Sequence, residues 1–146
     1  MLKYFSFVLS PLSAMQKGVQ TTHCAVDLIE KYRSDEQYRP MVSRWVNQDK
    51  TLIVLDGGCA QELANILTVI EENDFPYGVF RESAEFLNGI MTAVGVILPE
   101  CVYKAVRMDD LQAYLYVDPD GKRYIYALGS AVYDLLELKS GCRLAA

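Results

Sequence analysis

The sequence has little of what metal centres and membrane proteins require. Its 146 residues include one histidine and four cysteines, and the cysteines are widely spaced, without a C-x-x-C pair. A zinc site is not expected, because such sites gather several histidine and cysteine ligands at short spacings. No apolar run reaches the ~18 residues that a membrane-spanning helix needs. The spacing of the cysteines is typical of free thiols in a reducing compartment, so we expect a cytoplasmic protein with no membrane partner.

An excess of basic charge is also lacking. The net charge of −5 argues against a broad nucleic-acid surface, although a local basic patch remains compatible with it. The chain is 51% hydrophobic and 23% charged, which indicates a globular protein with a full core. The first residues, "MLKYFSFVLSPLSA", faintly resemble a secretion signal. The alternation in "KYFSFVL" instead predicts a first strand.

The first strand is expected over residues 3–10 and ends at Pro11. A helix then follows to about residue 32, with Ser13 as a plausible N-cap, because its hydroxyl can accept a hydrogen bond from a first-turn amide. Residues at helical spacing predict a buried face and a second, polar stripe. The predicted buried face holds Val19, Thr22, Val26 and Ile29, and the polar stripe holds Gln16, Gln20, His23 and Asp27.

Later segments continue the alternation of helices and strands. Residues 35–48 read as a helix with Pro40 in its first turn, and residues 59–73 as an amphipathic helix. "TLIVLDGG" is a short, entirely apolar strand, which predicts a central place in the sheet. "FPYGVFRE" and "GIMTAVGVILP" are two further strands. This order predicts an α/β protein with a mixed sheet and helices on its faces.

The C-terminal part reads as an addition to this α/β unit. "AYLYV-DPDGK-RYIYA" predicts a β-hairpin around a Pro-Asp-Gly turn. Its tyrosines either form an aromatic face for stacking bases or, as we favour, form cross-strand pairs over a core or a dimer seam. "SAVYDLLELKSG" predicts a short terminal helix that stops at Gly141. The tyrosines are Tyr114, Tyr116, Tyr124 and Tyr126.

Two stretches resemble one protein family. "VQTTHCA" resembles the "AAQxxHA" segment of type II peptidyl-tRNA hydrolases, the archaeal and eukaryotic kind. "ENDFPYGVFRESAEF…GIMTAVGVILPE" resembles that family's helix end, strand, acidic turn and final strand. With the first strand, the resemblance covers residues 3–100. It implies a small three-layer α/β fold with a four-stranded mixed sheet, often a homodimer, and hydrolysis of the ester that joins a peptide to a tRNA 3′ end.

The resemblance also implies roles for individual residues. Glu82 stands where the family has its key aspartate, and Gln20 and Thr92 match a family glutamine and threonine. The family's catalytic lysine falls at Gln16, and Lys17 follows one residue later. We therefore expect the catalytic residues to be Glu82, Lys17, Gln20 and Thr92, and the substrate-binding residues to be His23, Gln16, Ser13, Ser83 and Arg81.

Plainer interpretations of these residues stay open. A single histidine on a helix near a sheet, as at His23, is more typical of a hydrogen-bonded interior group than of a catalyst. Glu82 also fits a surface cluster with Arg81 and Glu85. "LDGGCAQE" hints at a phosphate-binding loop, but two glycines without the longer motif favour a simple strand-to-helix turn.

Two functions follow from the sequence, with a purely structural dimer module as a weaker third. In the first, Glu82 orients or deprotonates a water while Lys17, Gln20 or backbone amides stabilise the oxyanion, with peptidyl-tRNA as substrate and no cofactor needed. In the second, a catalytically lapsed member of the same fold binds a nucleotide-like small molecule or a protein partner. Both require Glu82 to face Gln20 across a shared cleft. We expect residues 1–100 to form the hydrolase-like domain and residues 101–146 an extension packed on it.

Overall fold

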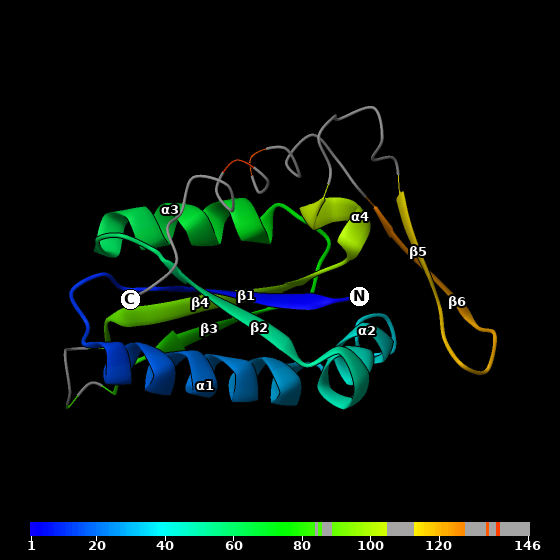
Figure 1. Ribbon diagram of the computed structural model, residues 1–146, viewed down its shortest axis with the longest axis horizontal. Helices are drawn as coiled ribbons and strands as arrows, with labels where there is room; N and C mark the ends of the chain where they lie inside the picture. Colours follow the sequence, from blue (N-terminus) through cyan, green and yellow to red (C-terminus); the bar gives the residue numbers. More distant parts are fainter. Residues whose placement is uncertain (84, 86–88, 105–112, 128–133, 135–136, 138–146) are drawn as a thin grey trace.

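A four-stranded mixed sheet forms the centre of the computed structural model (Figure 1). Its strands are β1 (Lys3–Val8), β2 (Thr51–Asp56), β3 (Tyr77–Arg81) and β4 (Met91–Leu98), in the order β2-β1-β4-β3. β1 runs parallel to β2 and antiparallel to β4, and β4 runs antiparallel to β3. The predicted α/β fold with a mixed sheet is therefore confirmed. The structure describes residues 1–83, 85, 89–104, 113–127, 134 and 137.

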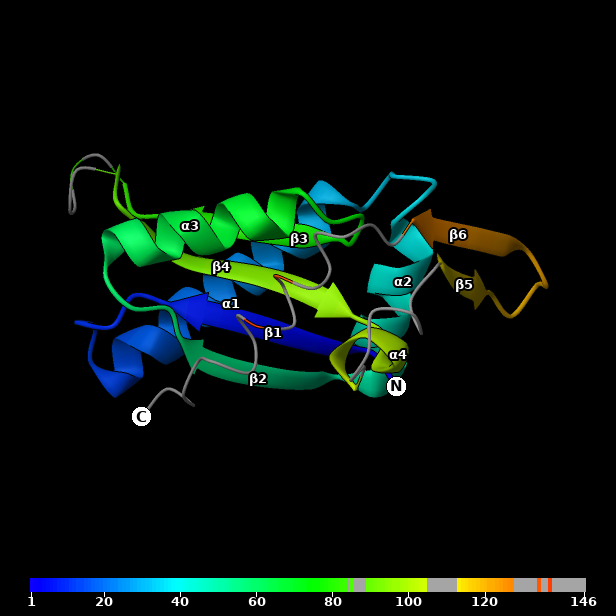
Figure 2. The ribbon, with the colours of Figure 1, turned by 90° about the horizontal axis from the view of Figure 1, so that it is seen from above.

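Two long helices cover the two faces of this sheet (Figures 1 and 2). α1 (Ala14–Lys31) packs on β1, β3 and β4, and α3 (Ala60–Glu71) packs on β1 and β4 from the other side. Between α1 and β2, α2 (Arg39–Arg44) continues into the π-helical turn η1 (Trp45–Asp49), and a short helix, α4 (Glu100–Tyr103), follows β4. None of the helices in the described part of the chain combines the length and the apolar character that crossing a bilayer requires.

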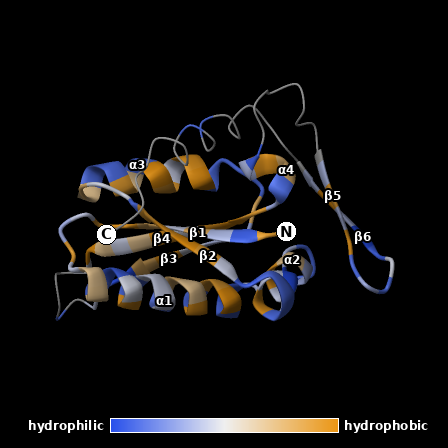
Figure 3. Cartoon of the chain, viewed as in Figure 1, coloured by the Kyte–Doolittle hydropathy of each residue, from blue (hydrophilic) through white to orange (hydrophobic). Residues whose placement is uncertain are grey.

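The prediction that "TLIVLDGG" lies at the centre of the sheet is wrong. β2 is an edge strand, and β1 and β4 occupy the centre. Every residue of β4 is buried, whereas Leu55 is the one buried residue of β2 and Leu52 is 39% exposed. The middle of β2 is nonetheless strongly apolar (Figure 3). A run of apolar residues therefore did not distinguish an edge position from a central one.

The predicted buried face of α1 is wrong for Val19, Thr22 and Val26, which are exposed, whereas Ile29 is half-buried and packs on the core. Val19 and Val26 are 46% and 57% exposed, while Gln20 and Thr21 are buried against the sheet. Polar residues are tolerated there because the sheet supplies partners: the hydroxyls of Thr21 and Ser6 lie 3.0 Å apart in a buried hydrogen bond. The full sheet-facing set is Gln20, Thr21, Cys24, Ala25 and Leu28.

Two glycines let α1 and the aromatic core approach the sheet closely. A Cβ atom at Gly78 would lie 2.8 Å from the Cβ of Leu28 and 3.1 Å from the carbonyl oxygen of Cys24. A Cβ atom at Gly95 would lie 1.9 Å from the hydroxyl oxygen of Tyr4. The distances of 2.8 and 1.9 Å are shorter than packed atoms adopt, so a side chain at either position would force the helix or the tyrosine to move.

The predicted hairpin is confirmed as β5 (Ala113–Val117) and β6 (Arg123–Ala127). Its tyrosines face each other across the strands, with Tyr114 opposite Tyr126 and Tyr116 opposite Tyr124. Tyr116, Tyr124 and Tyr126 are buried, which supports the interpretation that the tyrosines form pairs over a core. The hydroxyl of Tyr126 donates to the backbone carbonyl of Gln37 at 2.6 Å, and this contact fastens the hairpin beside α2.

The other face of the hairpin is apolar and open to solvent. Leu115, Val117 and Ile125 are all at least 49% exposed on it. The predicted terminal helix, "SAVYDLLELKSG", lies outside the described residues apart from Asp134 and Glu137. The division of the chain at residue 100 stays a prediction.

Candidate functional site

Three of the four residues predicted as catalytic form one hydrogen-bonded chain. The side-chain amide of Gln20 donates to Oε1 of Glu82 at 2.7 Å. The hydroxyl of Thr92 donates to Oε1 of Gln20 at 3.3 Å. Gln20 and Thr92 are buried and Glu82 is half-buried. The expectation that Glu82 faces Gln20 is therefore met, with helix α1, strand β4 and the segment that follows β3 each supplying one residue.

A break in the strand register places Thr92 in this chain. Phe80 of β3 pairs with Ala93, but the next residue, Arg81, pairs with Met91, so Thr92 is left without a partner on β3. Ala93 lies under α1 with Cys24. In an unbroken strand Thr92 would point to the opposite face from Ala93. The β-bulge turns its hydroxyl to the α1 side, which is a known use of bulges.

The backbone around Glu82 is fixed at the base of the loop that joins β3 to β4. The Glu82 N–H donates to the carbonyl of Ile90 at 3.0 Å, and the Gly89 N–H donates to the carbonyl of Ser83 at 3.3 Å. Gly89 has a φ of 72°, a conformation that favours glycine. The backbone of Glu82 is thus fixed by the closed base of the loop, and its carboxylate is held by Gln20.

The first turn of α1 accounts for Ser13 and Gln16. Ser13 is the N-cap, as predicted, and its Oγ accepts from the Gln16 N–H at 3.2 Å. Oε1 of Gln16 accepts in return from the Ser13 N–H at 2.9 Å, which completes a capping box. Gln16, at the family's lysine position, is therefore engaged in capping. Lys17 is half-buried three residues before Gln20, so the helical repeat places the two on neighbouring positions of one face.

His23 lies at the edge of this site, and the prediction of an interior histidine is wrong. Its side chain is exposed, and its ring stacks on Phe80 with centroids 4.7 Å apart and planes inclined by 13°. Phe80 is in β3, two residues before Glu82, which directly follows the strand. Arg81 and Ser83, also predicted to bind substrate, are exposed on either side of Glu82.

The helix that carries Gln20 and His23 also carries a buried thiol, that of Cys24. Cys24 follows His23 on α1 but points into the cluster with Val8 and Ala93. Burial raises the pKa of the Cys24 thiol to about 11. Because the thiolate is the nucleophilic form, Cys24 is not suited to act as a nucleophile at neutral pH. Among the described residues, no group of three or more histidine, cysteine, aspartate and glutamate side chains is placed to hold a metal ion.

The glycines of "LDGGCAQE" form a strand-to-helix turn. The Gly57 N–H donates to the carbonyl of Val8 at 2.7 Å, and Gly58 has a φ of 77°. The carboxylate of Asp56 accepts from the Gly58 N–H at 2.9 Å and from the Ser10 hydroxyl at 3.2 Å. These bonds account for the turn within the chain itself, in line with the simpler of the two interpretations.

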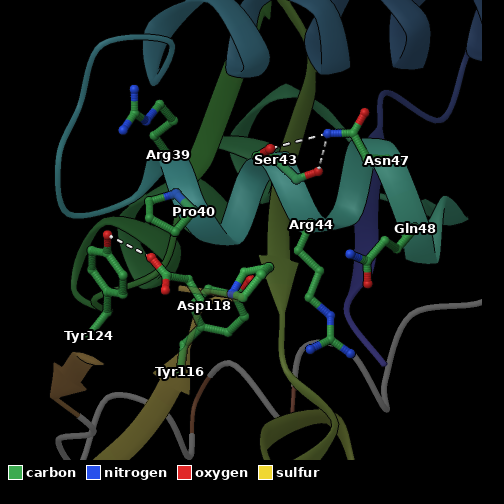
Figure 4. A pocket seen from close by; sticks show the side chains of 10 residues that line it. Arg39, Pro40, Ser43, Arg44, Asn47, Gln48, Tyr116, Asp118 and Tyr124 are labelled. Carbon is green, nitrogen blue, oxygen red and sulfur yellow. Dashed lines mark hydrogen bonds between the residues drawn. The ribbon is translucent and has the colours of Figure 1, made fainter. Parts of the chain in front are cut away.

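A groove that the sequence did not reveal lies at the junction of α2, η1 and the hairpin (Figure 4). Its volume is about 370 Å³, and none of the predicted site residues lines it. The polar side chains spaced four residues apart on the helix could have indicated one wall of the groove. The opposite wall could not be inferred, because it comes from a segment about seventy residues later. The lining includes Arg39, Ser43, Arg44, Asn47, Tyr116, Asp118 and Tyr124.

The family model of peptidyl-tRNA hydrolase PTH2 matches residues 8–108. The match includes the hydrogen-bonded chain of Gln20, Glu82 and Thr92 and ends before the hairpin. The chain therefore belongs to the peptidyl-tRNA hydrolase PTH2 family. No curated protein sequence matches the chain.

Proposed function

We propose that this protein hydrolyses the ester bond between the peptide and the 3′ end of peptidyl-tRNA. The observation that carries the proposal is the 2.7 Å hydrogen bond that holds the carboxylate of Glu82 against Gln20. One oxygen of Glu82 is engaged in that bond, and a carboxylate has a second oxygen that can accept from a water molecule. Membership of the family and the half-buried setting of the acid support this role.

In the proposed mechanism, Glu82 accepts a proton from water as the water oxygen attacks the ester carbonyl carbon. The tetrahedral intermediate then breaks its bond to the ribose oxygen, which takes a proton and leaves as the free 3′ end of the tRNA. The other product is the peptide with a new carboxylate. General base assistance of this kind contributes about 10²–10⁴ to the rate.

Gln20 and Thr92 act in this mechanism as positioning residues. The Thr92 hydroxyl engages the carbonyl end of the Gln20 side chain, so the amide end is turned toward Glu82. Lys17, one helical turn earlier, supplies positive charge for the developing oxyanion or for a tRNA phosphate. The positive end of the α1 dipole acts in the same direction, because residue 17 lies within the first turns of the helix.

The test is hydrolysis of peptidyl-tRNA by the full chain, followed as release of free tRNA. Glu82→Gln keeps the size of the side chain and removes the base, so activity is expected to fall by at least 100-fold. Glu85→Gln is the matched control, because Glu85 is exposed in the same loop. Equal activity of Glu82→Gln and the unaltered protein would overturn the proposal.

The second candidate is a lapsed enzyme that retains a ligand. The engagement of Gln16 in the capping box, where the family has its lysine, favours it. This candidate predicts that the unaltered protein gives no turnover and co-purifies with an ultraviolet-absorbing nucleotide-like compound. Turnover that depends on Glu82 would exclude it.

A further inference from the structure

We propose that His23 and Phe80 form the seat on which the terminal base of the tRNA stacks. The proposal rests on the proposed function, since it names the part of the substrate that this side of the site receives. Its starting point is the contact between the two rings, whose centroids are 4.7 Å apart and whose planes are nearly parallel.

The outer member of the stacked pair, His23, is exposed to solvent. One face of the His23 ring lies against Phe80, and the side chain as a whole is exposed. Phe80 is half-buried and packs on the cluster beneath α1, which fixes the lower ring. A flat, supported and solvated ring is the arrangement on which unpaired bases stack in single-stranded RNA recognition.

The seat also lies at a suitable distance from the acid. His23 is three residues after Gln20 on α1, so their Cβ atoms are about 5–6 Å apart. Glu82 directly follows β3, and the two residues of chain from Phe80 to Glu82 span at most about 7 Å. In peptidyl-tRNA the terminal base and the scissile ester are attached to the same ribose. A base on His23 therefore leaves the ester within reach of Glu82.

The direct test uses an RNA hairpin ending in CCA, with 2-aminopurine in place of the terminal adenine. Stacking quenches the fluorescence of this base, and the probe has no ester to hydrolyse. The unaltered protein is expected to quench the probe. His23→Ala should weaken its binding by about 5- to 150-fold, the range that alanine replacement of base-stacking side chains gives. His23→Phe should bind within about 3-fold of the unaltered protein, because it keeps the ring.

Thr22→Ala is the matched control, since Thr22 is exposed on the same turn and makes its hydrogen bond to the helix backbone at Gly18. Because the side chain of His23 is exposed, we expect its variants to fold as the unaltered protein does. Equal binding of the probe by His23→Ala and the unaltered protein would overturn the seat.

Hydrolysis of peptidyl-tRNA separates this inference from the proposed function. The seat predicts that His23→Ala raises KM and leaves kcat within a few-fold. Turnover by the unaltered protein with an unchanged KM in His23→Ala would overturn the seat but not the hydrolase. Quenching that depends on the ring at position 23, without turnover, would support the seat and overturn the hydrolase. Neither quenching nor turnover would overturn both.

Discussion

The Thr92 hydroxyl donates to the side-chain carbonyl of Gln20 across 3.3 Å, and this contact sets which end of the carboxamide meets Glu82. The contact exists because a β-bulge turns Thr92 toward α1. A single register irregularity therefore determines the orientation of the side chain that holds the acid.

Removing the Thr92 hydroxyl should lower activity through Gln20. Thr92→Val keeps the shape of the side chain and leaves a buried acceptor on Gln20 unsatisfied, which costs about 1–3 kcal/mol of stability. We expect kcat for peptidyl-tRNA hydrolysis to fall about 10-fold with little change in KM. Thr92→Ser, which keeps the hydroxyl, is the control. A Thr92→Val enzyme with full kcat would show that Gln20 needs no such support.

A side chain at position 95 should destabilise the fold. Gly95→Ala places a methyl group in the space of the Tyr4 ring, 1.9 Å from its hydroxyl oxygen. Overpacking of this kind costs about 1–3 kcal/mol, measured as a lower urea midpoint. The cost should shrink when Tyr4→Leu is present in both proteins being compared, because the two residues are in contact.

Gly18→Ala is the matched control for that experiment. Gly18 lies within α1, and a Cβ atom there would meet nothing within 4 Å. Alanine in a helix interior is favoured over glycine by about 1 kcal/mol, so this variant should be slightly more stable than the unaltered protein. Destabilisation by both replacements would point to a general intolerance of side chains rather than to the Tyr4 contact.

Alkaline pH should destabilise the protein through Cys24. Burial raises the pKa of this thiol from 9.0 to about 11 in the folded chain. Below pH 9 the thiol is protonated in both states and its contribution is fully present. As pH rises toward 11, the unfolded chain ionises first, so the free energy of unfolding falls by up to about 3 kcal/mol. Denaturant midpoints at pH 8, 9 and 10 should fall less in Cys24→Ala, and parallel slopes in the two proteins would contradict the assignment.

The Tyr126 hydroxyl should contribute to hairpin docking. Tyr126→Phe removes the donor to the Gln37 carbonyl and should cost about 1 kcal/mol locally. Backbone amides of β5 and β6 should then exchange hydrogen about 5-fold faster, while those of β4 stay unchanged. Ile125→Val, on the exposed face of the same strand, is the control. An unchanged rate of hydrogen exchange in Tyr126→Phe would show that packing of the Tyr126 ring, and not its hydroxyl, holds the hairpin in place.

The sequence predicted the elements of the fold well and the orientation of some of them poorly. Strand and helix positions followed from spacing, and the capping residue Ser13 followed from its hydroxyl. The buried face of α1 was misassigned because valine is more hydrophobic than glutamine or threonine. Hydropathy alone therefore predicted that positions 19 and 26, rather than Gln20 and Thr21, are buried. Only the sheet residues that pair with Gln20 and Thr21 reverse that preference, and they lie far away in sequence.

The candidate site was likewise predicted in part and missed in part. The resemblance to the family predicted that Gln20, Glu82 and Thr92 belong to one site. In the structure their side chains are joined by hydrogen bonds. The stacking of His23 on Phe80 was missed, because it depends on which strand lies beneath that turn of α1. The groove beside α2 was missed for a similar reason, since half of it comes from the hairpin.

Two backbone hydrogen bonds close the base of the β3–β4 connection. They fix the backbone of Glu82 without involving the side chains of the residues between them. Glu82 and Ser83 pair with Ile90 and Gly89, so the intervening residues begin and end at a fixed junction. Lengthening a loop adds closure entropy only slowly, about 0.6 kcal/mol for each doubling. This connection is therefore a natural place to graft a peptide tag or a new recognition sequence while the acid keeps its place.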